Sequence, residues 1–205
     1  MGVQTVKPDY SHHLEQPAEF EVQSTWWASP EGLEWKRQIA ERIPDGSTVL
    51  DAGAGSGAAI PCWLEHATHV TAVDSCDRAI GALMHHFGPQ SAVVHGDLRR
   101  LEHYMYGRSF DVVLCIAVLK HFSPEEWRTV LGELFAVADK RVIFTMGIAD
   151  DASDRNIDAP YYDRAEPMDV VCGAIPVGWA VTEIFGDPLE PAFVCDRIIA
   201  DGAVE

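Results

Sequence analysis

Short runs of apolar and β-branched residues alternate along this chain with amphipathic segments of helical period. The apolar runs predict strands at residues 48–51, 69–74, 91–95, 110–116 and 141–146. Helices are predicted between them, most clearly at residues 58–66 and 77–87. This alternation is typical of an α/β fold with a parallel sheet.

Helix-start signals stand at two further places. Ser29 followed by Pro30 predicts an N-cap and a first helical position, and Pro44 ends that pattern. We interpret residues 1–46 as an N-terminal helical cap. Ser123 and Glu126 form a capping box, and the helix that it starts has a regular apolar stripe: Trp127, Val130, Leu131, Leu134 and Phe135.

The alternation lapses in the acidic residues 147–173, which we interpret as a lid-like insertion. Residues 179–185 and 193–200 then predict two strands. Residues 186–191 between them are too few for a crossover helix, so this pair is antiparallel. We therefore expect one domain over residues 1–205, with a doubly wound Rossmann-like sheet of seven strands, mostly parallel and ending in an antiparallel C-terminal hairpin.

Composition narrows the function. Of 205 residues, 47% are apolar, and 15 Lys and Arg stand against 32 Asp and Glu, a net charge of −17. Such a surface repels nucleic-acid phosphates and anionic lipids, so neither general nucleic-acid binding nor membrane binding is expected. The sequence shows no export signal or long apolar run, and its five cysteines include no C-x-x-C pair, so we expect a cytoplasmic protein. No metal site is predicted, because the side chains of the doublets His12-His13 and His85-His86 diverge.

A glycine-rich turn carries the clearest chemistry. Residues 49–57 read VLDAGAGSG, a strand running into glycines that let the backbone approach a ligand. Asp74 lies 21 positions after Gly53, where a carboxylate that binds ribose hydroxyls is expected. The spacing predicts a nucleoside-containing cofactor.

Asp51 bears on which cofactor this is. A carboxylate just before the glycines would repel the pyrophosphate of a dinucleotide but attract a cofactor that has a positive charge and no phosphate. An NAD-dependent oxidoreductase, which shares the glycine turn and Asp74, remains the alternative.

At this point the sequence closely resembles the class I S-adenosylmethionine-dependent methyltransferases. The family's D-x-G-x-G-x-G loop, which wraps the methionine end of the cofactor, maps onto Asp51, Gly53, Gly55 and Gly57. The resemblance implies that Asp74 accepts hydrogen bonds from both ribose hydroxyls. It places Ser75 and Cys76 beside the adenine.

The resemblance continues to residue 122. It implies that Asp97 accepts from the adenine amino group and that the backbone N–H of Leu98 donates to a ring nitrogen. It also places the backbone of Cys115 and Ile116 at the methionine amine. Residues 117–122, AVLKHF, resemble the family segment near the transferring methyl group, which makes Leu119 a candidate substrate contact.

Several of these residues also have plainer interpretations. His121 is a candidate general base, although capping or packing explains a histidine there equally well. Asp111 begins a strand, away from the active edge, and we interpret it as structural. Lys120 is expected to face solvent, and Cys115 to contribute backbone rather than a thiolate.

Two aromatic doublets are candidates for covering the site. Trp26 and Trp27 precede the first predicted helix, where family members place an aromatic lid, although core packing is the alternative. Tyr161 and Tyr162, in the acidic insertion, are a second candidate pair.

The resemblance thus implies transfer of a methyl group from S-adenosylmethionine to an oxygen or nitrogen of a small molecule. A catalytically silent cofactor-binding protein is a further alternative, and RNA is a weaker acceptor candidate because no basic patch is present. We expect the acceptor determinants in residues 1–30, 119–121 and 147–173. The sequence does not indicate the oligomeric state.

Overall fold

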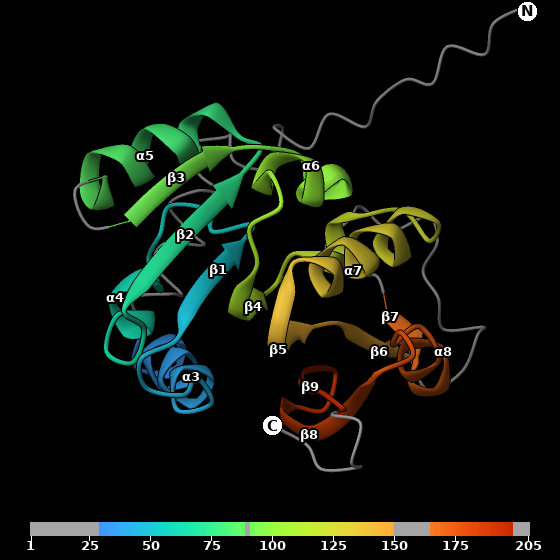
Figure 1. Cartoon of the computed structure of the whole chain (residues 1–205). Helices are drawn as coiled ribbons and strands as arrows, with labels where there is room; N and C mark the ends of the chain where they lie inside the picture. Colours follow the sequence, from blue (N-terminus) through green and yellow to red (C-terminus); the bar gives the residue numbers. More distant parts are fainter. Residues whose placement is uncertain (1–28, 89–90, 150–164, 199–205) are drawn as a thin grey trace, which may run out of the picture.

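The computed structural model describes residues 29–88, 91–149 and 165–198, and its main element is a seven-stranded sheet (Figure 1). The strands follow the order β3-β2-β1-β4-β5-β9-β8. Their bounds are β1 (Thr48–Ala52), β2 (His69–Asp74), β3 (Ser91–His95), β4 (Phe110–Cys115), β5 (Ala138–Thr145), β8 (Trp179–Asp187) and β9 (Glu190–Arg197). Strands β1 to β5 are parallel, and β9 lies antiparallel between β5 and β8. The predicted doubly wound, mostly parallel sheet with a C-terminal hairpin is confirmed.

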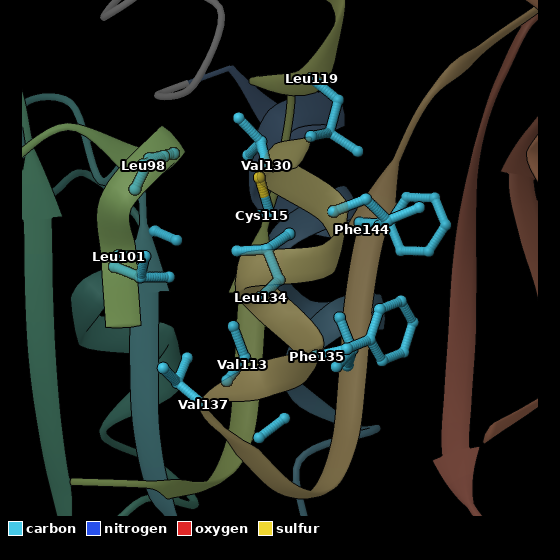
Figure 2. Packing of buried hydrophobic residues seen from close by; sticks show 14 of the residues in the cluster. Leu98, Leu101, Val113, Cys115, Leu119, Val130, Leu134, Phe135, Val137 and Phe144 are labelled. Atoms are coloured by element: carbon cyan, nitrogen blue, oxygen red, sulfur yellow. The ribbon is translucent and has the colours of Figure 1, made fainter. Parts of the chain in front are cut away.

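Helices cover both faces of this sheet. They are α3 (Pro30–Ala40), α4 (Ile60–Trp63), α5 (Asp77–Phe87), α6 (Leu101–Met105), α7 (Glu126–Ala136), α8 (Met168–Gly173) and the 3₁₀ turns η1 (Leu98–Arg100) and η2 (Leu119–His121). Buried residues of α3, α4 and α5 pack in one cluster, and those of α6, α7 and α8 pack in the other. Figure 2 shows the second cluster, in which Leu134 of α7 packs with Val113 of β4.

Strand β4 is apolar at successive positions because both faces of the sheet are covered. Val113 and Cys115 belong to the α7 side, whereas Val112 and Leu114 belong to the α3 side. Side chains alternate across a strand, so a strand buried on both faces must be apolar at successive positions.

The hydrogen bonds of both predicted helix starts are present, although α7 itself begins at Glu126, after a turn at residues 124–125. The hydroxyl of Ser29 accepts from the N–H of Gly32 over 3.1 Å. In the capping box, the N–H of Ser123 donates to Glu126 Oε2 over 3.1 Å, and the N–H of Glu126 donates to Ser123 Oγ over 3.2 Å. Each pair satisfies backbone N–H groups that have no partner within the helix.

The helix predicted at residues 58–66 is shorter, because α4 spans only Ile60–Trp63. Tighter bonds between residues three apart flank it: Ile60 N–H donates to the Gly57 carbonyl, and His66 N–H donates to the Trp63 carbonyl. These bonds convert the ends of the segment into turns.

The hairpin and β5 also differ from the prediction. Strand β5 begins at Ala138, three residues earlier than expected. The hairpin connection shrinks to Pro188 and Leu189, because Asp187 pairs with Glu190 and its Oδ1 accepts from the N–H of Leu189 over 2.8 Å.

The segment interpreted as a lid-like insertion contains regular structure at both described ends. Strands β6 (Gly147–Ala149) and β7 (Ala165–Pro167) pair in parallel, and α8 follows. Val171 of α8 is fully buried in the core on the α7 side, so this end of the segment is part of the domain core. Within the described ranges, no helix has the length and apolar character to cross a bilayer.

Candidate functional site

The carboxyl ends of β1, β2 and β4 form one edge, and the glycine turn bends across it. Asp51 pairs in register with Ala72 of β2 and with Leu114 of β4. Immediately beyond β1, the N–H groups of Gly53 and Ala54 both donate to the Val73 carbonyl, over 2.8 and 3.0 Å. The turn is therefore fixed at the edge where open α/β sheets bind ligands.

Gly55 leaves open space in this turn. Its φ is +55°, and a Cβ built on it would meet no protein atom within 4 Å. At Gly53 and Gly57, by contrast, a Cβ would lie 2.5 Å from Val118 and 2.6 Å from Phe87. Packing thus requires two of the glycines, whereas the third keeps a backbone surface accessible to a ligand.

Asp74 ends β2 directly beside this surface. Its Oδ2 accepts from the N–H of Gly55 and its Oδ1 from the N–H of Cys76, each over 2.9 Å. The side chain is buried, and burial raises the pKa of Asp74 although these N–H groups partly offset it. The carboxylate is held in one orientation by backbone donors from both sides.

Asp51 is a second buried carboxylate, on β1. Its Oδ2 accepts from the indole Nε1 of Trp63 over 2.9 Å. The pKa of Asp51 is raised to about 6. Burial is the largest cause, the hydrogen bond from Trp63 acts in the opposite direction, and the nearby charge of Asp74 adds to the increase. No sequence pattern predicts a role for Trp63 in the site, because nothing in its spacing from Asp51 indicates that contact.

Asp97 follows β3 on the same edge. The N–H of Gly96 donates to the Asp74 carbonyl over 2.9 Å, which fixes the Asp97 loop beside β2. The guanidinium of Arg99 pairs with the Asp97 carboxylate over 2.6 Å. Burial raises the pKa of Asp97, but the hydrogen bonds and charge of Arg99 outweigh it and hold the pKa below its ordinary value.

The end of β4 supplies backbone. Cys115 is fully buried, and burial raises the pKa of its thiol, so the sulfur is a neutral core group, as predicted. Leu119 is also fully buried, in the cluster that includes Val130 of α7 and Phe144 of β5 (Figure 2). A substrate contact by Leu119 would therefore require its neighbours to move.

A polar network fixes the backbone beyond β4. Ala117 has a φ of +59°, and its N–H donates to Thr145 Oγ1 over 2.7 Å. Glu190 accepts from Thr145 over 3.4 Å and from Lys120 Nζ over 2.8 Å. Lys120 was expected to face solvent, and this prediction is wrong, because its side chain is only 19% exposed in the ion pair.

The other predicted site residues lie as follows. His121 ends η2 and is partly buried, and Ser75 is exposed beside the buried Cys76. Asp111 lies at the opposite strand end and accepts from both the N–H and the hydroxyl of Thr48, each over 2.8 Å, as expected for a structural carboxylate. Trp26, Trp27, Tyr161 and Tyr162 lie outside the described residues. Among residues 29–88, 91–149 and 165–198, no group of three or more His, Cys, Asp or Glu could hold a metal ion.

Comparisons with known proteins agree with this geometry. Residues 49–141 match a family model described as a methyltransferase domain. Magnesium-protoporphyrin O-methyltransferase from Synechocystis sp. is 26% identical over 113 residues, which cover 52% of this chain and 47% of that protein.

Two solved structures share the fold. An O-methyltransferase family protein from Burkholderia thailandensis superimposes with a TM-score of 0.70 at 15% identity, covering 91% of this chain and 61% of that one. The N-methyltransferase NodS from Bradyrhizobium japonicum, in complex with S-adenosylhomocysteine, has a TM-score of 0.69 at 15% identity, with 91% and 95% covered. The match thus spans less than two thirds of the curated relative and of the Burkholderia protein.

Proposed function

We propose that this chain is a class I S-adenosylmethionine-dependent methyltransferase, on the basis of its sheet order and of the match of residues 49–141 to a methyltransferase domain. In this proposal it transfers a methyl group from S-adenosylmethionine to an oxygen or nitrogen of a small molecule.

The observation that carries the proposal is the pair of buried carboxylates, Asp51 and Asp74, beside the open surface of Gly55. Two acids there suit a cofactor with an ammonium, a sulfonium and ribose hydroxyls, and they oppose a pyrophosphate. The residues present therefore fit S-adenosylmethionine.

In this assignment each residue holds one part of the cofactor. Asp51 and the backbone at Cys115 and Ile116 face the methionine amine, and the turn of Gly53, Gly55 and Gly57 lies along the methionine end. Asp74 accepts from the ribose hydroxyls. The adenine contacts are assigned to four residues: Ser75, Cys76, Asp97 and Leu98.

The bound cofactor supplies an electrophilic methyl group on sulfur. The chain contributes position: the network of Ala117, Thr145 and Glu190 fixes the backbone on the acceptor side. Alignment of an acceptor with the methyl carbon accounts for much of the rate enhancement in such a transfer. His121, at the end of η2, is the candidate base for an acceptor that must lose a proton.

The acceptor class is supported by the relatives and by charge. The Synechocystis protein is named as an O-methyltransferase and NodS as an N-methyltransferase. The net charge of −17 opposes nucleic-acid acceptors. A small-molecule acceptor is consistent with both.

Thermal denaturation with S-adenosylmethionine, S-adenosylhomocysteine or NAD tests the cofactor. We expect both sulfur compounds to raise the melting temperature and NAD to leave it unchanged, because only a ligand of the native state stabilises it. Stabilisation by NAD alone would favour the oxidoreductase alternative.

Incubation with methyl-labelled S-adenosylmethionine and a small-molecule extract tests transfer, with Asp74→Asn as the control. At a cofactor concentration near the Kd of the unsubstituted protein, we expect labelled products with that protein and much less product with Asp74→Asn. Cofactor binding without any labelled product would favour a silent binding protein.

A further inference from the structure

Arg99 donates hydrogen bonds to both oxygens of the Asp97 carboxylate. The backbone N–H and Nε of Arg99 donate to Oδ1 over 3.0 and 2.9 Å. Nε also lies 3.0 Å from Oδ2, and Nη2 donates to Oδ2 over 2.6 Å. A bidentate arrangement of this kind fixes the plane of a carboxylate as well as its position.

Arg99 is itself held from the other side. Its Nη1 donates to Glu126 Oε1 over 2.7 Å. The other oxygen of Glu126 accepts from the N–H of Ser123, so the same carboxylate caps α7. The guanidinium is thereby tied to the first turn of a helix whose apolar side is in the core.

These contacts fix the Asp97 carboxylate but leave part of its side chain accessible. Three N–H groups of Arg99 donate to it, and Nε is shared between both oxygens. The Asp97 side chain is 29% exposed, so a ligand can approach it.

We propose that Arg99 is a positioning residue that sets the purine specificity of the cofactor site: it holds Asp97 in the orientation that accepts from the 6-amino group, and Glu126 anchors Arg99 to α7. This inference rests on the proposed function and deepens it. The Gly96–Asp74 backbone bond already holds the Asp97 loop beside the end of β2. Arg99 then fixes the direction of the acceptor, which reduces the ordering that binding would otherwise require.

The test compares two ligands by calorimetry: S-adenosylhomocysteine and its analogue with hydrogen in place of the 6-amino group. The unsubstituted protein should bind S-adenosylhomocysteine about tenfold more tightly, the scale of one charge-assisted hydrogen bond. Arg99→Gln should reduce this ratio to about twofold or less, mainly by weakening S-adenosylhomocysteine. Arg99→Lys should also reduce the ratio, because lysine keeps the charge without the planar fork.

Arg141→Gln is the matched control. Arg141 makes the same kind of paired contact with Asp196, over 2.5 and 3.0 Å, but on β5 and β9 away from the adenine end. It should lower the melting temperature and leave the ligand ratio unchanged, which separates positioning from general stability.

The outcomes separate this inference from the function. An unchanged ratio in folded Arg99→Gln or Arg99→Lys would overturn it, and so would equal binding of both ligands by the unsubstituted protein, while cofactor binding itself would stand. Failure to bind S-adenosylhomocysteine at all would overturn the proposed function, and the inference with it.

Discussion

The backbone N–H of Gly55 donates to Oδ2 of Asp74 over 2.9 Å, which joins the glycine turn after β1 to the carboxylate that ends β2. Two segments that are separate in the sequence thereby become one surface. A ligand that binds Asp74 therefore also lies against the turn.

We expect Asp74→Asn to weaken binding of S-adenosylhomocysteine by about 1.5–3 kcal/mol, the scale of a lost hydrogen bond to a charged group. Asparagine keeps the size of the side chain and one acceptor oxygen. Calorimetry measures the effect, with Asp111→Asn as a control at the opposite end of the strands. Unchanged affinity in Asp74→Asn would show that the ribose is held elsewhere.

Asp97→Asn should cost less affinity than Asp74→Asn, because one adenine contact is lost rather than a paired contact to a diol.

Gly55→Ala should fold and lose at least about tenfold in cofactor affinity, because its Cβ occupies the open surface. Gly46→Ala is the matched control. Gly46 also has a positive φ, +84°, with nothing within 4 Å of its Cβ position, but it precedes β1. Both variants should lose about 1–2 kcal/mol of stability from the left-handed backbone. Equal cofactor affinities in the two variants would contradict the placement of the ligand over Gly55.

The sequence predicted what short-range patterns determine. Strand β4 was predicted to within one residue because a strand buried on both faces must be apolar throughout. The capping box before α7 was predicted because Ser123 and Glu126 lie three residues apart. Insertion of β9 between β5 and β8 is a contact between distant segments. Hairpin signals establish that two strands pair, but not which of them lies beside β5.

The candidate site was likewise predictable only where its residues lie in a short-range sequence pattern. Asp51, Asp74 and the glycines stand in a local motif, and the structure brings them together. The contacts that Trp63, Thr145 and Glu190 make in the site form only when distant segments fold together. No sequence pattern near Asp51 or Ala117 predicts these contacts. Arg99 did have a local signal, since it lies two residues after Asp97, the spacing at which an aspartate accepts from the backbone N–H of a turn.

The raised pKa of Asp51, about 6, predicts opposite pH effects on stability and on binding. A folded-state pKa above the unfolded value means that the folded protein binds more protons. The contribution of Asp51 to the stability of the fold is therefore fully present below about pH 3.8, and it is lost as the pH rises through about 6. Cofactor affinity should instead rise over the upper part of this window, because the ionised form attracts a cation.

Asp51→Asn tests both effects at once. It should raise stability at pH 7.5 by up to about 3 kcal/mol, because no buried ionised carboxylate then opposes folding, while weakening S-adenosylmethionine binding. Asp111→Asn is the control of opposite sign. Backbone and side-chain hydrogen bonds from Thr48 and the charge of Lys140 outweigh burial and lower the pKa of Asp111, so this variant should lose stability near neutral pH. Melting curves from pH 4.5 to 8 measure both, and a stability difference for Asp51→Asn that does not vary with pH would contradict the assignment.

Thr145→Val should lower both stability and methyl transfer. The Thr145 hydroxyl accepts from the N–H of Ala117, a residue held at a φ of +59°. Valine keeps the branched shape of threonine but leaves that N–H without its acceptor, at a cost of about 1–3 kcal/mol. Because Ala117 lies between the cofactor end of β4 and η2, the turnover number should fall more than the affinity for S-adenosylhomocysteine. Thr182→Val is the matched control, since the Thr182 hydroxyl donates to Asp196 over 2.7 Å within the hairpin and should affect stability alone. If both variants change turnover equally, the network beyond β4 supports only the fold, and acceptor alignment must come from other residues at this edge.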